Sequence, residues 1–160
     1  MTEAPDLENN PIVSKVRAWD SEAFSEVSDF RGDLTLVLKP ERLIRTSEFL
    51  RNEPGLEFEY LSDISVLDRF PLDPRFELNY HLLSIVNRQT LRLRVFIPDS
   101  SHPVVETITS VWPTANWHER ENFDLFGIRF EGHPDLRRIL LPDDWEGYPL
   151  RRDYPTEGYR

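Results

Sequence analysis

Two histidines and two acidic residues in the last third of the chain are the side chains best placed for chemistry. His118, Glu121 and Asp124 follow one another at intervals of three residues, and His133 comes nine residues later. Because residues three apart share one face of a helix, the first three predict a common polar face. Imidazole and carboxylate groups placed together can bind a metal ion or act as a general base.

The same residues also fit a simple ion-pair interpretation. Arg120 precedes Asp124 by four residues, the spacing at which opposite charges pair along a helix. Arg137 and Arg138 offer further partners for the acidic residues. One histidine and two acids on a single helix fall short of a usual ligand set, so we favour ion pairing over metal binding or catalysis.

Several templates for catalysis and cofactor binding are absent from the sequence. Gly127 and Gly132 have the glycine spacing of a phosphate-binding loop, but His133 and Pro134 stand where lysine and serine or threonine are required. The chain has no cysteine, which excludes disulfides, thiolate catalysis and cysteine-ligated zinc or iron–sulfur clusters.

The charge balance excludes further function classes. The 19 basic and 29 acidic residues leave a net charge of −10, which repels the phosphate backbone of nucleic acids. No apolar run approaches the roughly 20 residues that a membrane-spanning helix needs. The amino-terminal residues are polar and do not resemble a signal peptide, so we expect none. We therefore expect a protein that binds no nucleic acid and has no membrane span of its own.

The first half of the chain predicts two helical regions around one strand. Apolar residues recur at helical spacing over residues 12–27, a run that Asp20 and Ser21 could split into two short helices. Residues 34–38 alternate like a strand, and Pro40 is suited to begin a second helix, which Pro54 and Gly55 end.

The second half predicts three strands and a final helix. Period-two alternation covers residues 56–66, 76–82 and 91–97, with Glu57, Glu59 and Glu77 facing Arg92 and Arg94 across the strands. A helix over residues 115–126 ends at a glycine suited to a C-cap. This order predicts an α+β fold, a ferredoxin-like type of sandwich with a mainly antiparallel sheet and helices on one face.

We expect three parts along the chain. Residues 1–11 are polar and predict a loose amino-terminal arm, and residues 12–131 form the α+β domain. Residues 132–160 are rich in proline and in charges of alternating sign. They predict an extended tail that is too short to build a second core and that therefore packs on its own domain or on a partner.

The carboxy-terminal half closely resembles the signature of the 30-kDa-subunit family of respiratory complex I, whose bacterial members are its C subunits. The similarity covers roughly residues 30–155, and Arg152 stands where many members carry lysine. The motif residues that carry the resemblance are Glu119, Arg120, Glu121, Asp124, Gly127, Gly132, His133 and Pro134, followed by Arg137, Arg138, Arg151, Arg152, Asp153 and Tyr154.

This resemblance implies a structural and assembly subunit of a proton-translocating NADH:quinone oxidoreductase, without catalytic residues of its own. It implies a place in the peripheral arm on the cytoplasmic side of the bacterial inner membrane, attached to the membrane only through the complex. The implied partners are the large subunit of the quinone cavity and the small subunit that holds the terminal cluster. FMN, iron–sulfur clusters and quinone would be bound by other subunits, with no cofactor or metal in this chain.

For the tail we formulate a sharper hypothesis. Arg137 and Arg138, together with Arg151, Arg152, Asp153 and Tyr154, are expected to dock on a partner subunit and not on this domain. Three other interpretations stay open on the sequence: the equivalent subunit of a related ferredoxin-dependent or hydrogen-evolving membrane complex, a free-standing hydrolase, and an acidic binding module.

Overall fold

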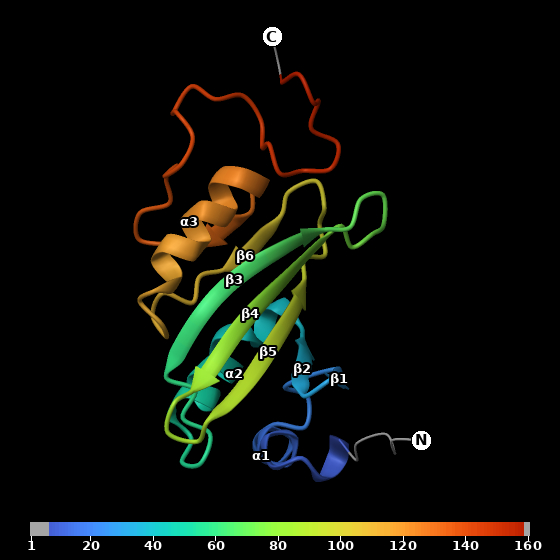
Figure 1. Cartoon of the computed structure of the whole chain (residues 1–160), viewed down its shortest axis with the longest axis vertical. Coiled ribbons are helices and arrows are strands. Elements are labelled where there is room, and N and C mark those ends of the chain that lie inside the picture. The colour runs from blue at the N-terminus through green and yellow to red at the C-terminus, as the bar shows by residue number, and fades with distance from the viewer. Residues whose placement is uncertain (1–6, 159–160) are drawn as a thin grey trace.

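The computed structural model describes residues 7–158, and its main feature is a five-stranded sheet (Figure 1). The strand order is β1-β2-β5-β4-β3, in which β2 and β5 are parallel and all other neighbours are antiparallel. The predicted α+β class with a mainly antiparallel sheet is therefore confirmed. The five strands are β1 (Glu26–Phe30), β2 (Asp33–Leu38), β3 (Tyr60–Asp68), β4 (Phe76–Ser84) and β5 (Gln89–Phe96).

Within residues 7–158, three α-helices and two short 3₁₀ turns complete the fold. Proline begins the first two helical regions, and the Asn10 side chain accepts the Ile12 N–H at 2.9 Å as an N-cap. In Figure 1, α2 lies behind the sheet and α3 lies beside β3. The helical elements are η1 (Leu7–Asn9), α1 (Pro11–Trp19), η2 (Pro40–Arg42), α2 (Leu43–Asn52) and α3 (Ala115–Phe126).

Strand register explains how the core is built. Leu36, Leu93, Tyr80 and Ile64 are successive neighbours across β2, β5, β4 and β3, and all four side chains are buried. Along β4 and β5, buried residues alternate with half-buried ones. One face of the sheet therefore carries the core, and the other face stays partly open.

The amino-terminal prediction needs two corrections. The helical run predicted over residues 12–27 breaks at Asp20, one of the two residues expected to split it: α1 ends at Trp19, and the Asp20 carboxylate accepts the Glu22 N–H to form a turn. The chain then forms β1, which pairs with β2, where the apolar spacing predicts a helix. Within the expected loose arm, residues 7–9 form a helical turn and Pro11 already begins α1, while residues 1–6 lie outside the described residues.

The strand predicted from residue 56 begins only at Tyr60. Leu56 and Phe58 are buried as predicted, but their N–H groups donate to the carbonyls of Glu53 and Leu50 at 3.0 Å each. These bonds join the segment to the end of α2 and remove it from the sheet. The alternation of apolar and polar residues over 56–60 therefore reflects the burial of Leu56 and Phe58 and not the pairing of a strand.

The predicted charge ladder is correct at one position. Arg94 Nε lies 3.0 Å from Glu77 Oε1, on neighbouring strands. Glu57 and Glu59, however, accept from Asn87 Nδ2 and from the Ile85 N–H, both in the β4–β5 turn. Because these two acids precede β3, their carboxylates accept hydrogen bonds from the β4–β5 turn and do not face the arginines.

A second, smaller sheet and α3 lead into the carboxy-terminal segment. Strands β6 (Val104–Glu106) and β7 (Arg129–Glu131) are parallel, and α3 lies between them in sequence. The Asn122 side chain fastens α3 to β3 by donating to the Ile64 carbonyl at 2.7 Å. Residues 132–158 contain no helix or strand and pass over the end of α3 in Figure 1.

Candidate functional site

Asp124, at the end of α3, organises the first part of the tail. Its side chain is fully buried, and Oδ2 accepts the N–H groups of Ile139, Leu140 and Leu141 at 3.0, 2.8 and 3.0 Å. Oδ1 accepts from Arg138 Nη1 at 2.7 Å. Burial alone would raise the pKa of Asp124, but these donors outweigh it and the pKa lies below its ordinary value. Asp124 is therefore a charged structural anchor.

Arg138 extends this anchor into the tail. Its Nη2 atom donates to the carbonyls of Trp145 and Gly147 at 3.2 and 3.3 Å, and its guanidinium lies 5.6 Å from the centre of the Tyr148 ring. The predicted ion pairing between the acids and this arginine is confirmed at Asp124. A single arginine thus ties α3 to a loop that has no regular structure.

Arg120 does not pair with Asp124, although their spacing favours it. Its Nε donates to the Arg137 carbonyl at 3.2 Å, and its guanidinium lies over the Trp117 ring at 5.2 Å. Asp124 is unavailable because tail N–H groups and Arg138 occupy it. The Arg137 side chain remains 70% exposed and pairs with Asp135.

Gly127 allows the tail to cover the end of α3. It caps the helix at φ 73°, as predicted, and a Cβ at this position would lie 2.5 Å from the Tyr148 ring. Leu150 N–H donates to the Leu125 carbonyl at 3.2 Å, and Arg151 Nε donates to the Phe126 carbonyl at 2.7 Å. The last carbonyls of the helix are therefore satisfied by the tail.

The end of the tail reaches the β3–β4 hairpin. Arg75 binds Asp68 through Nε and Nη2 at 2.8 and 2.7 Å, and binds Asp153 through Nη1 at 2.9 Å. Asp68 Oδ2 also accepts the Arg152 N–H at 2.8 Å. Although burial opposes it, hydrogen bonding by Arg75 and by the Arg152 and Phe70 N–H groups lowers the pKa of Asp68 to about 2.

These contacts correct the tail hypothesis. Arg138, Arg151 and Asp153 dock on their own domain, contrary to the expectation that they would bind only a partner. Tyr154 stays within the tail, where its hydroxyl donates to the Glu146 carbonyl at 3.2 Å. Sequence reasoning missed Asp68 and Arg75 because 78 residues separate Arg75 from Asp153, and no local spacing signals such a pair.

Glu119 is the second buried acid of α3 and has a different environment. Its carboxylate accepts from the Thr107 hydroxyl at 2.5 Å and from the Ile108 N–H at 2.8 Å. Burial without a strong cationic partner exceeds the effect of these bonds and raises the pKa of Glu119 to about 7. His133 Nε2 lies 3.9 Å away, and burial lowers the pKa of this histidine. Glu119 therefore joins α3 to the segment after β6, through Thr107 and Ile108, and lies beside the turn after β7, which carries His133.

The four residues singled out for metal binding or catalysis do not act together. His118 Nδ1 lies 3.6 Å from Asp63 on β3, whereas Asp124 faces the tail and His133 faces Glu119. Glu121 is exposed. Within residues 7–158, no group of three or more His, Cys, Asp or Glu side chains is arranged to hold a metal ion. Gly132 and Pro134 belong to the turn that leads from β7 into the tail.

The contacts described above pack the tail against α3 and the β3–β4 hairpin. Comparison with known proteins then assigns the chain to a family. The model of the respiratory-chain NADH dehydrogenase 30 Kd subunit matches residues 36–160. The chain belongs to this family. The match includes α3, the β3–β4 hairpin and the tail, so all the anchors described above lie within the shared region.

Curated relatives support the assignment over most of the chain. The C subunit of the NADH-quinone oxidoreductase of Roseiflexus sp. (strain RS-1) is 46% identical over 149 residues, which cover 93% of this chain and 85% of the relative. The corresponding C 2 subunit of Rhizobium etli (strain CIAT 652) is 41% identical over 160 residues, covering 100% and 82%.

Two solved structures share the fold. A trypsin-resistant fragment (1-134) of Nqo5 is 34% identical with a TM-score of 0.63, covering 78% of this chain and 96% of the fragment. A chain of the membrane-bound sulfane sulfur reductase, an archaeal respiratory membrane complex, has a TM-score of 0.76 at 23% identity, covering 91% and 84%. At that identity the second likeness concerns the fold alone.

Proposed function

We propose that this chain is a structural and assembly subunit of the peripheral arm of a proton-translocating NADH:quinone oxidoreductase, and that it contributes no catalytic residue. The observation that carries the proposal is how the family motif is used. Glu119, Asp124 and Gly127 are turned inward to hold segments of this chain, and none of them faces an open cleft. Motif residues used in this way stabilise the fold of the chain and the surface that it presents to partners.

The proposal extends to cofactors and location. Without cysteine the chain cannot hold a cysteine-ligated cluster, so the proposal assigns the iron–sulfur clusters to other subunits. It assigns FMN and quinone to other subunits as well, as the family resemblance implies. The helices found in residues 7–158 are too short or too polar to span a bilayer. We place the chain on the cytoplasmic side of the bacterial inner membrane, held there by the large quinone-cavity subunit and the small terminal-cluster subunit.

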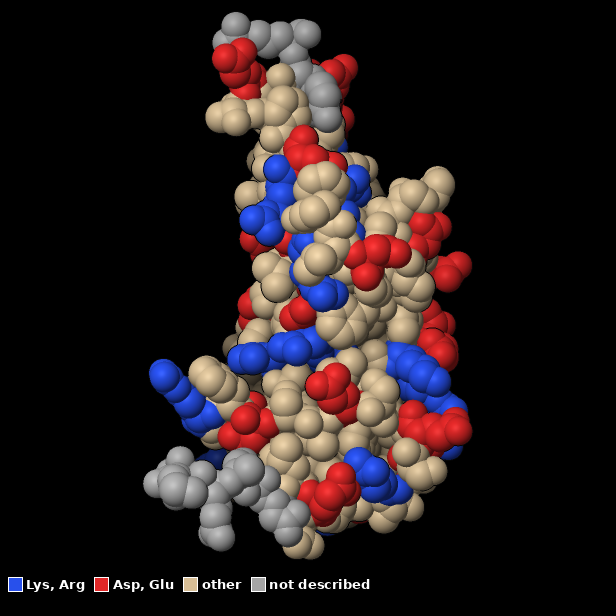
Figure 2. All heavy atoms as spheres, turned by 90° about the vertical axis from the view of Figure 1, so that its right-hand side faces the viewer, with Lys and Arg blue, Asp and Glu red and all other residues tan. Residues whose placement is uncertain are grey.

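The surface is compatible with protein partners. On the face that Figure 2 displays, basic and acidic side chains are interspersed and form no single basic patch. Such mixed charge suits selective protein contacts better than binding to a polyanion. The identities of 41% and 46% to NADH-quinone oxidoreductase subunits favour this machine over the ferredoxin-dependent or hydrogen-evolving alternatives.

Deletion and complementation test the proposal. Removing the gene should abolish NADH-driven quinone reduction in membranes and remove the intact complex from native gels. The wild-type chain should restore both. If membranes without the chain keep a full-size complex with normal quinone reduction, the proposed role is wrong. If reduction depends on the chain but only with a ferredoxin as donor, the chain serves a related complex.

A further inference from the structure

The half-open face of the sheet has a charged centre. Arg92 and Arg94 on β5 flank His81 and Asn79 on β4, and all four side chains are only partly buried. In Figure 1 the strands β3, β4 and β5 lie in front of α2, so this face points away from the helix layer. The exposed Leu67 adds apolar surface at the β3 edge.

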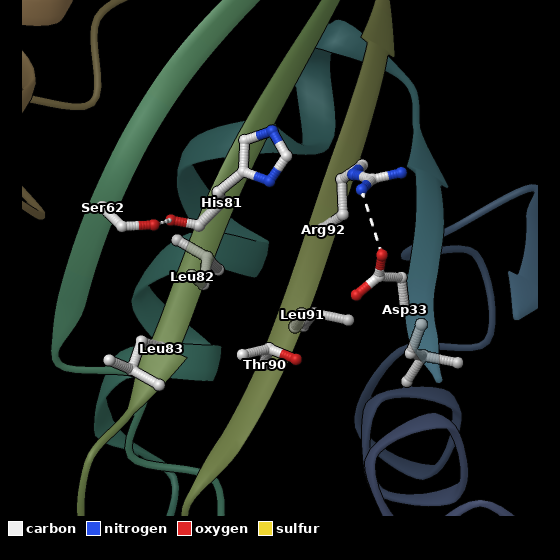
Figure 3. A pocket seen from close by; sticks show the side chains of 9 residues that line it. Asp33, Ser62, His81, Leu82, Leu83, Thr90, Leu91 and Arg92 are labelled. Atoms are coloured by element: carbon white, nitrogen blue, oxygen red, sulfur yellow. Dashed lines mark hydrogen bonds and ion pairs between the residues drawn. The ribbon is translucent and has the colours of Figure 1, made fainter. Parts of the chain in front are cut away.

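Arg92 is less well satisfied than its neighbour. Arg94 lies 3.0 Å from Glu77, whereas Arg92 reaches its nearest carboxylate, that of Asp33, only at 3.7 Å (Figure 3). The Nε atoms of both arginines are shielded from solvent and donate no hydrogen bond to any described residue, so the two guanidinium groups differ in their distance to a carboxylate. A buried donor without an acceptor is costly, so the Arg92 guanidinium still has capacity for an oxygen ligand.

A hollow lies beside this guanidinium. It has a volume of about 220 Å³ and is lined by polar side chains and by leucines from the strands, the polar ones being Asp33, Ser62, His81, Thr90 and Arg92. Figure 3 shows these side chains arising from four strands, β2, β3, β4 and β5. At about 30 Å³ per water molecule, the space suits one inserted side chain and not a whole helix.

We propose that this sheet face is an interface with another subunit of the same complex, and that the partner inserts an aspartate or glutamate side chain beside Arg92. The inference rests on the proposed function. A carboxylate matches the planar guanidinium fork, and the half-buried Leu83 at the hollow offers apolar contact to the stem of such a side chain. A second copy of this chain fits less well, because each copy carries a net charge of −10.

Photocross-linking in the assembled complex tests the interface. Thr90 lines the hollow and is exposed, so a photoreactive benzoylphenylalanine at this position should form an adduct with another subunit after purification and irradiation. Mass spectrometry should place the adduct within a few residues of an aspartate or glutamate. Adducts with a second copy, or with a segment that lacks acidic residues, would overturn the proposal.

Charge removal provides the second measurement. Arg92→Gln should lower the amount of chain recovered in the complex at least fivefold, while Arg45→Gln, at an exposed position of α2, should leave recovery unchanged. If Arg92→Gln impairs folding of the chain, the cross-link from position 90 still tests the interface, because that complex keeps Arg92. If the chain is recovered in the complex but Thr90 forms no adduct, only the interface is wrong. If the chain is absent from the purified complex, the proposed function fails as well.

Discussion

The Asp124 carboxylate and the Arg138 guanidinium lie 2.7 Å apart, although 14 residues separate them in sequence. The Asp124 side chain is fully buried and that of Arg138 is 15% exposed. Asp124 also accepts hydrogen bonds from three backbone N–H groups of the tail. A single carboxylate therefore holds residues 138–141 against the end of α3. Replacing the acid exposes no new surface but leaves several buried donors without acceptors.

We therefore expect Asp124→Asn to reduce the free energy of unfolding by about 3–5 kcal/mol, the usual cost of breaking a buried ion pair. Urea unfolding followed by tryptophan fluorescence measures it. Glu121→Gln, at an exposed position of the same helix, is the control and should change stability by less than about 0.5 kcal/mol. A loss below about 1 kcal/mol for Asp124→Asn would show that the tail does not depend on this carboxylate.

Glu119 predicts a pH-dependent stability. Its pKa of about 7 in the folded chain lies above the ordinary value of 4.5, so folding favours the protonated form. The stabilisation is present at low pH and is lost as pH rises from about 4.5 through 7. Between pH 5 and 8, wild type should lose about 2–3 kcal/mol relative to Glu119→Gln, since each pKa unit corresponds to about 1.4 kcal/mol.

Denaturant unfolding of both proteins at several pH values measures this difference. Comparing the two proteins removes the contributions of the titratable groups that lie far from residue 119. A constant difference between wild type and Glu119→Gln across this range would mean that the carboxylate is ionised throughout.

Substitution of Gly127 combines two physical effects, backbone strain and steric overlap, which a control substitution can separate. An alanine there has φ near 73° and places Cβ 2.5 Å from the Tyr148 ring. We expect Gly127→Ala to cost about 2–4 kcal/mol. Gly32→Ala is the matched control because its φ is 90° but nothing lies within 4 Å of the added Cβ, so it should cost about 1 kcal/mol.

A double-mutant cycle with Tyr148→Ala isolates the overlap. Once the ring is removed, Gly127→Ala should cost about as much as Gly32→Ala, because only backbone strain remains. Thermal or urea unfolding of the four proteins gives the coupling energy. Equal costs of Gly127→Ala with and without the ring would show that the tail does not pack on this glycine.

The contrast between Gly127 and Tyr148 also shows what the sequence could predict. Helix α3 and its C-cap were predictable because helical periodicity and a glycine are local signals. The ring that covers Gly127 was not, because loops without periodicity give no sign of where they pack. The same limit hid the docking of the tail on Asp68 and Arg75, which depends on contacts across the whole domain.

Strand β1 escaped prediction for a different reason. Ala23 and Val27 continue the apolar spacing of α1, so the pattern alone favours a second short helix after Asp20 and Ser21. Pairing of β1 with β2 overrides it, because only tertiary context supplies the neighbouring strand. Strands β6 and β7 have three residues each, too few for a period to be recognised. The motif can therefore be recognised from local sequence signals. The residues that contact it can be identified only from the folded structure.

Arg151 and Arg152 give the sharpest test of the corrected tail, because they are neighbours with different surroundings. Arg151 Nε donates to the Phe126 carbonyl at 2.7 Å, and its guanidinium lies 4.7 Å from the centre of the Tyr148 ring. The Arg152 side chain makes one long bond of 3.4 Å to the Phe70 carbonyl and is exposed. Its anchoring contact to Asp68 uses the backbone N–H, which survives truncation.

We expect Arg151→Ala to lower the free energy of unfolding of the isolated chain by about 1–3 kcal/mol, and Arg152→Ala by about 0.5 kcal/mol or less. Released tails should also be cut faster by trypsin at the remaining arginine, which intact mass measurements follow over time. In membranes, Arg152→Ala should be the more selective variant, because any loss of assembled complex then reflects a partner contact and not unfolding. If the two truncations destabilise the isolated chain equally, the tail is not anchored through the Phe126 carbonyl as the structure shows.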